Sequence, residues 1–264
     1  MTYGAAGSDG HQHGVIRELF DSGRVTHGGW CMLGNPFAAE IVSASGCDWL
    51  VIDQQHGYIS DEAMRGMIQA AGIRGTPVLV RVPRNEPIAI GHALDAGAEG
   101  VIVPMISTAA DARRASEASH YPPLGDRSWG PLRAGMAQPG FDTRAGNAQV
   151  ICIAMMETAE GVGNLEEIVA VPGLDGVLVG PNDLAISHSG TNAGAAASAH
   201  DLELIERVAQ VCLKASVPAG IVCASGEDAR RWEAMGFNFL ALPSDIQLLD
   251  ARLKLELAAA RNRR

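Results

Sequence analysis

The sequence has little positive charge, no paired cysteines and no long apolar run, and each shortage excludes a class of protein. Lysine and arginine together number 20 against 30 aspartates and glutamates, a formal net charge of −10, so no basic face is available for a nucleic-acid backbone. No apolar stretch reaches the roughly 18 residues that a membrane-spanning helix needs. The opening residues, MTYGAAGSDGHQHG, lack the positive and apolar segments of a secretion signal. We therefore expect a cytoplasmic protein without nucleic-acid or membrane partners, with a flexible tail over residues 1–14.

The cysteines and the overall composition fit one globular domain. The five cysteines occur singly, with neither a C-x-x-C motif nor the spacing of metal ligands, which is typical of reduced thiols in a core. Hydrophobic residues make up 47% of the chain and charged residues 19%, as in ordinary soluble proteins. A length of 264 residues allows one large core. We expect a single domain over residues 15–264.

Eight short apolar runs recur along the chain, separated by segments with helical spacing. The runs are HGGWCML from residue 27, DWLVID from 48, PVLVRV from 77, GVIVPM from 100, VICIAMM from 150, DGVLVG from 175, VPAGIV from 217 and NFLALP from 238. They are continuously apolar, which is typical of parallel strands covered on both faces. Eight strand–helix units in one chain indicate an α/β fold, a (β/α)8 TIM barrel, because a doubly wound sheet usually stops at about five or six strands.

Two connections are longer than a barrel requires, and the terminal segment is unusually apolar. Residues 121–148 and 186–200 are expected to leave the carboxyl end of the barrel, where long loops serve as lids or active-site walls. Residues 244–264 predict a helix whose leucines spread beyond one narrow stripe. This helix either packs against the barrel or contacts another subunit.

The carboxyl ends of barrel strands converge on one site, and here they carry reactive side chains. The residues at these positions are Trp30, Asp53, Gln54, Gln55, His56, Arg81, Pro104, Glu157, Asp183 and Val222. Glu157 and Asp183 end neighbouring strands, whose axes lie about 5 Å apart. Two carboxylates that close repel unless a cation or a shared proton lies between them. Oxygen ligands without an adjacent cysteine or histidine pair favour Mg²⁺ or Mn²⁺.

Each of these side chains also has a structural explanation. Asp183 could cap the helix that follows Pro181, and Glu157 could be a first-turn glutamate of the next helix. Arg81 could form a structural salt bridge, and His56 could be a surface-loop histidine. Their occurrence together at one end of the barrel favours a metal site. The GPND stretch from residue 180 adds free backbone N–H groups that can hold a substrate carboxylate.

The scarcity of lysine narrows the chemistry. The chain has only Lys214 and Lys254, and neither ends a strand, so an enolate cannot be made through a lysine Schiff base. A divalent metal chelated by a 2-oxo acid remains, with no organic cofactor. Arg81 is then placed to stabilise oxyanion charge and His56 to act as general base. We expect Asp53 to hydrogen-bond the His56 ring and raise its basicity.

Six motifs occur in order with family-like spacing: DWLVIDQQHG, PVLVRVP, GAEGVIVPM, YPPLGDRSWGP, METAEGVGN and LDGVLVGPNDLA. From residue 28 to residue 250 the chain resembles the HpcH/HpaI family of class II pyruvate-type aldolases. The resemblance implies a lyase that joins or cleaves the bond between a 2-oxo acid enolate, from pyruvate or hydroxypyruvate, and an aldehyde. It assigns Glu157 and Asp183 to the metal, His56 with Asp53 to the base, and Arg81 to the oxyanion.

The resemblance also implies a carboxylate site, an assembly and a branch of the family. Gly180, Pro181 and Asn182 would hold the pyruvate carboxylate through backbone N–H groups, and the chain would form a homohexamer with its terminal helix exchanged between subunits. Gln55 stands where many members have an acid, and Met155 where many have a glutamine. With RSWGPLR, this pattern looks more like the branch of hydroxy-ketoacid aldolases.

The remaining contacts and the competing interpretations stay open. Gln55, Met155, Trp30 and Val222 are expected to complete the substrate-binding set, with the aldehyde held by residues 121–148 and 186–200 and by a neighbouring subunit. The alternatives are a CoA-ester lyase of the citrate-lyase β type and a catalytically silent 2-oxo acid binding barrel. The first needs a cleft for an adenine nucleotide, for which the sequence offers no basic, aromatic-rich loop.

Overall fold

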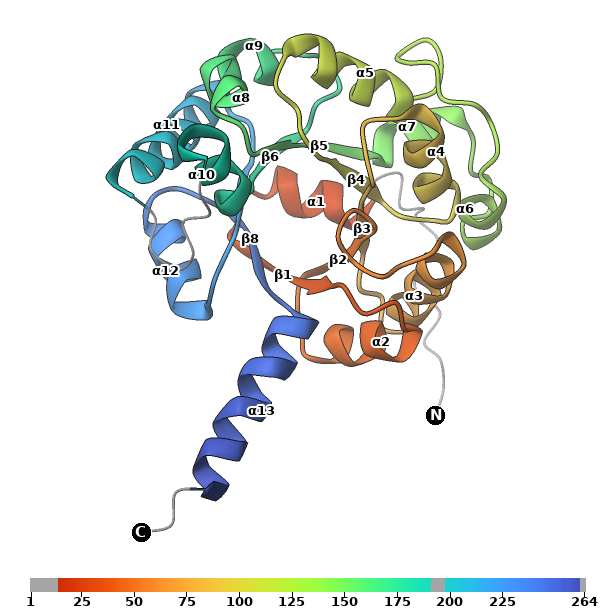
Figure 1. Ribbon diagram of the computed structural model, residues 1–264. Coiled ribbons are helices and arrows are strands. Elements are labelled where there is room, and N and C mark those ends of the chain that lie inside the picture. Colours follow the sequence, from red (N-terminus) through yellow and green to blue (C-terminus); the bar gives the residue numbers. More distant parts are fainter. Residues whose placement is uncertain (1–13, 191–197, 262–264) are drawn as a thin grey trace.

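The computed structural model describes residues 14–190 and 198–261, and its centre is a closed barrel of eight parallel strands in the order β1 to β8 (Figure 1). The strands are β1 Thr26–Cys31, β2 Trp49–Asp53, β3 Val78–Arg81, β4 Gly100–Val103, β5 Ile151–Met156, β6 Gly176–Val179, β7 Ala219–Val222 and β8 Phe239–Ser244. Each of the eight apolar runs contains one of these strands, except that β1 begins one residue before its run and β8 ends one residue after its run. The predicted (β/α)8 barrel is therefore confirmed.

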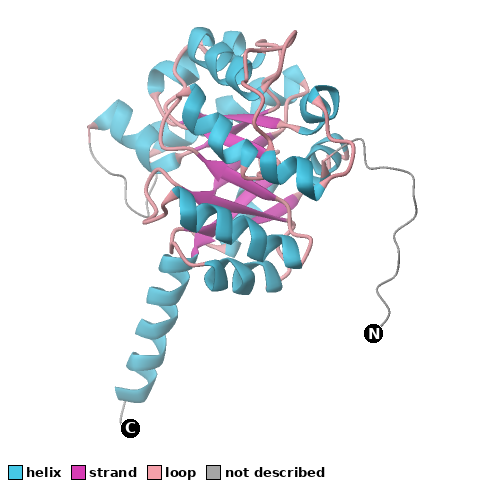
Figure 2. Cartoon of the chain, turned by 90° about the vertical axis from the view of Figure 1, so that its right-hand side faces the viewer, coloured by secondary structure: helices cyan, strands magenta, loops and turns pink. Residues whose placement is uncertain are grey.

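Helices lie around most of the outside of the barrel, and the last helix projects away from it (Figures 1 and 2). In the described residues they are α1 Val15–Asp21, α2 Pro36–Ala44, α3 Asp61–Ile73, α4 Pro87–Asp95, α5 Ala109–Ser119, α6 Leu132–Ala137, α7 Thr143–Gln149, α8 Ala159–Gly163, α9 Leu165–Val169, α10 Pro181–Ser189, α11 Ala199–Ala215, α12 Gly226–Ala234 and α13 Asp245–Arg261. A side-chain cap from Ser60 marks the start of α3, and the capping box of Thr108 with Asp111 marks the start of α5. Among the described residues, no helix combines the length and the apolar character needed to cross a membrane.

The core has two layers, because every strand is buried on both faces. One cluster lies between the strands and the outer helices, and it includes the buried Cys152, Cys212 and Cys223. The other fills the barrel interior, where the rings of Trp49 and Phe239 stack with centroids 3.7 Å apart. Apolar side chains therefore fill the inside of the barrel, and a reactive site is expected at its carboxyl end.

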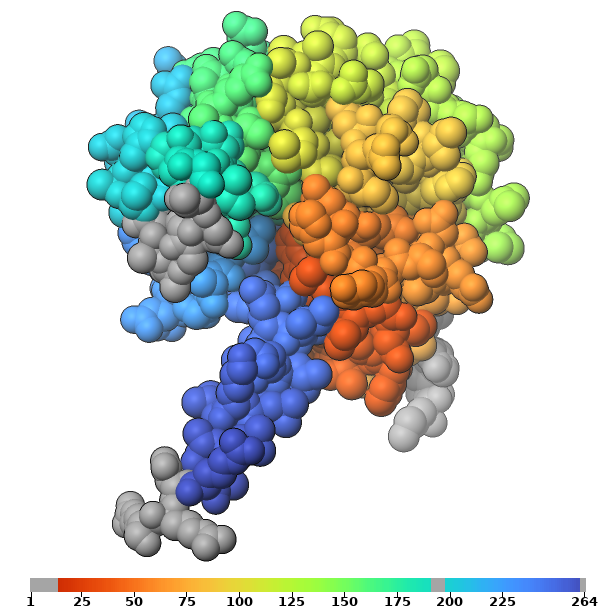
Figure 3. Space-filling view, viewed as in Figure 1, coloured from red at the N-terminus to blue at the C-terminus, as the bar shows by residue number. Residues whose placement is uncertain are grey.

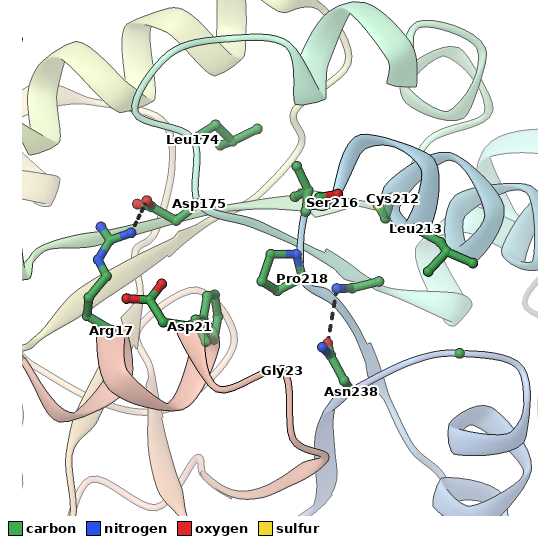
Figure 4. Close-up of a pocket in the computed structure, with 14 residues that line it drawn as sticks. Arg17, Asp21, Gly23, Leu174, Asp175, Cys212, Leu213, Ser216, Pro218 and Asn238 are labelled. Atoms are coloured by element: carbon green, nitrogen blue, oxygen red, sulfur yellow. Dashed lines mark hydrogen bonds and ion pairs between the residues drawn. The ribbon is translucent and has the colours of Figure 1, made fainter.

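Helix α1 closes the amino end of the barrel. Its Ile16 is fully buried in the interior cluster, and the Glu99 carboxylate accepts the Ile16 N–H at 2.9 Å. The Arg17 guanidinium pairs with Asp175 at 2.6 Å. A hollow of about 620 Å³ opens beside this ion pair, with Pro218 and Asn238 among its walls (Figure 4). Since Asp175, Pro218 and Asn238 directly precede strands β6, β7 and β8, the hollow lies opposite the predicted site.

The expected position of residues 121–148 at the carboxyl end is wrong. The segment begins after α5 and leads into β5, and helices of a barrel run antiparallel to its strands, so the segment lies at the amino end. There Arg127 binds Asp95 at 2.8 Å, and Arg133 donates to the Ala96 carbonyl at 3.0 Å, just before β4. These residues therefore cannot line the mouth of their own barrel.

The second long connection is partly helical. Residues 186–189 belong to α10, and α11 begins at Ala199. Residues 191–197 lie outside the described part of the chain, as do residues 1–13 of the predicted tail. The expected aldehyde contacts from this connection and the character of the tail therefore stay predictions.

The terminal helix α13 projects away from the barrel instead of packing on it (Figures 1, 2 and 3). Only its root contacts β1 and β8, and every residue from Gln247 to Arg261 is exposed. Leu248 is 54% exposed and Leu255 64%. Of the two interpretations that the sequence left open, packing on its own barrel is thus wrong.

Candidate active site

The inward-facing columns of three strands carry polar side chains at the carboxyl end of the barrel. Side chains alternate between the two faces of a strand, so every second residue points inward. The columns are Trp49, Val51 and Asp53 in β2; Leu79 and Arg81 in β3; and Ile151, Ile153, Met155 and Glu157 in and just after β5. The members nearer the amino end of each strand form the apolar interior, and those at the carboxyl end form the candidate site.

Asp53 and Arg81 form a buried, bidentate ion pair. The β2–β3 register places them opposite each other. Arg81 Nε donates to Asp53 Oδ1 at 2.8 Å, and Nη2 donates to Oδ2. Burial alone would raise the pKa of Asp53, but the hydrogen bonds and charge of Arg81 outweigh it and hold the pKa below its ordinary value. The salt bridge that the sequence left as an alternative is thus present.

The remaining contacts of this pair hold Arg81 in one orientation. Trp30 Nε1 donates to Asp53 Oδ2 at 3.2 Å, and the Arg81 guanidinium lies 5.0 Å from the Trp30 ring centroid. Arg81 Nη1 has the Met155 sulfur as an acceptor at 3.6 Å, which is a weak hydrogen bond. Nη1 is therefore held in place but makes only a weak hydrogen bond, so it can donate to a ligand oxygen.

Glu157 is a buried carboxylate in which one oxygen accepts a hydrogen bond and the other has no partner among the described residues. Its Oε1 accepts the Met105 N–H at 2.7 Å, while its Oε2 is buried and has no hydrogen-bond partner among the described residues. Burial, with the negative charge of Asp183 as a further cause, raises the pKa of Glu157 to about 7. Glu157 precedes Thr158, the N-cap of α8, so its alternative role as a first-turn glutamate is wrong.

Asp183 lies in the first turn of α10, immediately beyond β6. The N-cap of this helix is Gly180, so the alternative role of Asp183 as the cap is wrong. A Cβ atom on Gly180 would stand 3.0 Å from Glu157 Oε2, which brings the start of α10 directly against that carboxylate. The half-buried Asp183 and the buried Glu157 therefore share one corner of the site.

This corner fits a divalent cation. An orphaned, buried carboxylate oxygen beside a second carboxylate is costly unless a positive charge satisfies both. The described residues contain no group of three or more histidine, cysteine or acidic side chains able to hold a metal. Two carboxylates alone fit Mg²⁺ or Mn²⁺, which keep other positions for water or substrate oxygens.

His56 lies on the loop after β2 with its ring exposed. Asp53 Oδ1 accepts the backbone N–H of His56 at 3.2 Å and that of Gln55 at 3.0 Å. The expected hydrogen bond in which the His56 ring donates to Asp53 is not among the contacts of the described residues. Arg81, Trp30 and the backbone N–H groups of Gln55 and His56 occupy the Asp53 carboxylate instead.

The expected substrate-binding residues divide into two groups. Trp30 and Met155 are buried in the interior cluster, with the half-buried Val222 packed against it, and they line the inner wall. Gln55 is half-buried, and its Oε1 has no partner among the described residues.

The expected carboxylate cradle needs a correction. Pro181 has no N–H, and the Gly180 N–H already donates to the Met156 carbonyl at 3.1 Å. In the described part of the chain, the first-turn N–H groups of α10 that donate no hydrogen bond are those of Asn182 and Asp183.

Met105 is a contributor that sequence reasoning missed. It follows Pro104 after β4, holds an unusual φ of 57° and presents its N–H to Glu157. Only its position in the sequence could have indicated this role, because the residue after Pro104 also lies at the carboxyl end of the barrel. Its side chain is mostly exposed, so its role is carried by the backbone.

Comparison with known proteins identifies the lineage. The family model described as HpcH/HpaI aldolase/citrate lyase matches residues 27–251. The chain belongs to this family. The predicted membership, and with it a carbon–carbon lyase, is therefore confirmed.

Two curated relatives in the HpcH/HpaI family align over most of the chain. The hydroxypyruvate/pyruvate aldolase of Rhizorhabdus wittichii is 35% identical over 246 residues, which are 93% of this chain and 98% of the relative. The 2-dehydro-3,6-dideoxy-6-sulfogluconate aldolase of Pseudomonas putida is 33% identical, over 89% of this chain and 92% of the relative. Relatives in the family thus act on different acids.

Solved structures agree with the fold. An HpcH/HpaI aldolase/citrate lyase family protein from Burkholderia cenocepacia superposes with a TM-score of 0.85 at 30% identity, covering 93% of this chain and 98% of that one. A citrate lyase β subunit from Mycobacterium tuberculosis, complexed with oxaloacetate and magnesium, has a TM-score of 0.57 at 18% identity and covers 87% and 95%. The second likeness supports the fold alone.

Proposed function

We propose that this protein is a divalent-metal-dependent aldolase that joins or cleaves the bond between an aldehyde and the enolate of pyruvate or hydroxypyruvate. The observation that carries this proposal is the unpaired, buried Oε2 of Glu157 beside Asp183, in the same inner layer as the clamped Arg81. A 2-oxo acid would add its own oxygens to the two carboxylates and complete the coordination of the cation.

The relatives support an aldolase over the CoA-ester lyase. Hydroxypyruvate/pyruvate aldolases from Rhizorhabdus wittichii and Roseovarius nubinhibens are each 35% identical over more than 90% of both chains. The citrate lyase β subunit is 18% identical. Donor specificity follows the fine detail of a site, so the nearer relatives are the better guide.

The donor would be held at both of its ends. The free amides of Asn182 and Asp183 at the start of α10 suit its carboxylate, and the partial positive charge of a helix start favours an anion. The Met155 thioether and the Trp30 ring give the site an apolar wall. Gln55 Oε1, which is buried and has no partner among the described residues, would accept a hydrogen bond from a hydroxyl on the donor.

The chain's own residues divide the proton and charge handling between them. A divalent cation on Glu157 and Asp183 would supply Lewis acidity at the 2-oxo group. His56 takes a proton from C3, and Arg81 Nη1 stabilises the negative charge that develops on the 2-oxo oxygen. C3 then bonds to the aldehyde carbon, and the resulting alkoxide recovers a proton from His56.

Deuterium exchange tests this proposal directly. In D₂O, the methyl signal of pyruvate and the methylene signal of hydroxypyruvate should fade in the proton NMR spectrum when protein and Mg²⁺ are both present. Excess EDTA should stop the exchange, and added Mg²⁺ should restore it. A silent binding barrel would give no exchange above the rate of Mg²⁺ alone, and that result would refute the assignment.

Replacing Arg81 by lysine is expected to slow the exchange by about a hundredfold, as for loss of one oxyanion donor. A point-like ammonium cannot bind both Asp53 oxygens and still reach the donor. Arg84→Lys is the matched control, because Arg84 is exposed and pairs only loosely with Glu86 at 3.5 Å. Equal exchange rates in the two variants would show that Arg81 is structural only.

We further propose a homo-oligomer, a hexamer that exchanges α13 between subunits. The helix exposes leucines at 248, 249, 253, 255 and 257, and its own barrel covers none of them. A second copy offers the same apolar surface in return, as an isologous contact requires. Five half-exposed leucines on one projecting helix are otherwise a liability in water.

Ending the chain after Gln247 should reduce the oligomer to smaller species. The truncation removes all five leucines while leaving the barrel intact, so folding is preserved and assembly is lost. Multi-angle light scattering at micromolar concentration gives the mass of both forms. A full-length chain that runs as a monodisperse species of 27.6 kDa would contradict the proposal.

A further inference from the structure

The root of α13 is joined to the mouth of the barrel by one carboxylate. Asp245, the first residue of the helix, accepts the Met32 N–H through Oδ1 at 2.9 Å and the Leu33 N–H through Oδ2 at 3.2 Å. Met32 and Leu33 directly follow β1. The carboxylate therefore ties the carboxyl end of β8 to the segment that leaves β1.

That segment in turn supports the loop of His56. The Met32 carbonyl accepts the Tyr58 N–H at 3.2 Å. The two backbones pack without spare room, since a Cβ atom on Gly34 would stand 2.3 Å from the Tyr58 carbonyl oxygen and one on Gly57 3.1 Å from that of Met32. A shift of residues 32–34 must therefore move residues 57 and 58.

The same segment also continues into the buried ion pair. Trp30, two residues before Met32, donates to Asp53 and lies over Arg81. The metal corner is built differently, from β5, β6 and α10, and Asp245 has no hydrogen bond to it among the described residues. Asp245 thus reaches the base loop and the arginine but not the carboxylates.

We propose that Asp245 is a positioning residue that fixes the Met32–Gly34 segment and, through it, the loop that carries His56. This inference rests on the proposed function and names a further residue on which the proton transfer depends. Small misplacements of reacting groups are costly in rate, whereas the Glu157–Asp183 pair and the α10 amides that hold the donor carboxylate are built from other elements and stay in place. The expected signature is a loss in kcat without a loss in binding.

Two substitutions of Asp245 and one control test the inference. In Asp245→Ala, kcat for Mg²⁺-dependent C3 exchange should fall by about tenfold to a hundredfold, with the KM for pyruvate and the Mn²⁺ affinity within about twofold of wild type. Asp245→Asn keeps one acceptor oxygen and should fall in between. Asp250→Asn is the control, since Asp250 lies on the same helix and its ion-pair partner among the described residues is the exposed Lys254.

An independent substitution guards against a simple folding defect. Gly34→Ala leaves Asp245 intact but places the new alanine Cβ against the Tyr58 carbonyl oxygen. This variant should therefore show the same lower kcat at unchanged KM. Thermal unfolding and light scattering on each variant report fold and assembly. The positioning role is refuted if Asp245→Ala keeps the wild-type kcat. It is also refuted if the variant shows a lower kcat together with a higher KM and a weaker metal affinity. If wild-type protein itself shows no metal-dependent exchange, it is the proposed function that fails.

Discussion

Replacing His56 by alanine should slow Mg²⁺-dependent C3 exchange of pyruvate by about a hundredfold to ten-thousandfold, the range for loss of a general base. The His56 ring is exposed and packs into no core, so its removal should leave the fold, the KM for pyruvate and the metal affinity unchanged. Exchange in D₂O, followed by NMR over a range of donor concentrations, separates the rate from the binding.

His92→Ala is the matched control for this experiment. His92 is also exposed, on α4, and its only ion-pair partner among the described residues is Asp61 at 3.6 Å. It should exchange donor protons at the wild-type rate. A His56→Ala enzyme that does the same would mean that another group removes the proton, and the assignment of the base would have to be abandoned.

Replacing Glu157 by glutamine should weaken Mn²⁺ binding by at least about a hundredfold, because outer-sphere changes alone often cost ten- to a hundredfold. The amide keeps the size of the side chain but removes the charge that the buried oxygen would give the cation. The free Mn²⁺ signal in electron paramagnetic resonance measures this affinity without any reference to activity. Glu160→Gln, an exposed acid in the first turn of α8, is the matched control.

Metal affinity should also depend on pH through Glu157. Burial raises the pKa of this carboxyl to about 7, so below that pH a proton competes with the metal for the same oxygens. Apparent Mn²⁺ affinity should therefore be nearly constant above pH 8 and fall by about tenfold for each pH unit below 7. Glu157→Gln should flatten this dependence. A flat wild-type profile between pH 5 and 8 would argue that Glu157 is not the ligand.

The positions of the site residues could be predicted from the sequence because they depend on local periodicity and on the barrel topology. Alternation along β2, β3 and β5 carries Asp53, Arg81 and Glu157 to the top of inward columns, and the carboxyl ends of parallel strands must meet. Asp183 follows from the helix start after β6.

The pairing of these residues could not be predicted, because a carboxylate chooses among all donors within its reach. Asp53 lies three residues from His56 in sequence but faces Arg81 across the β2–β3 register, and the buried guanidinium outcompetes an exposed ring. The same limit applies to Met105, whose N–H meets Glu157 across 52 positions of the chain.

By itself, the sequence determined eight apolar strands, the helices between them and the polar side chains at the strand ends, since periodicity and burial act within each segment. The tertiary structure alone decided on which end of the barrel residues 121–148 lie, and that α13 leaves the barrel. These follow from the direction of neighbouring elements and from single long-range bonds such as Asp245 to Met32, 213 positions apart. Hydrogen bonds of this kind have no period, so only the folded chain brings donor and acceptor together.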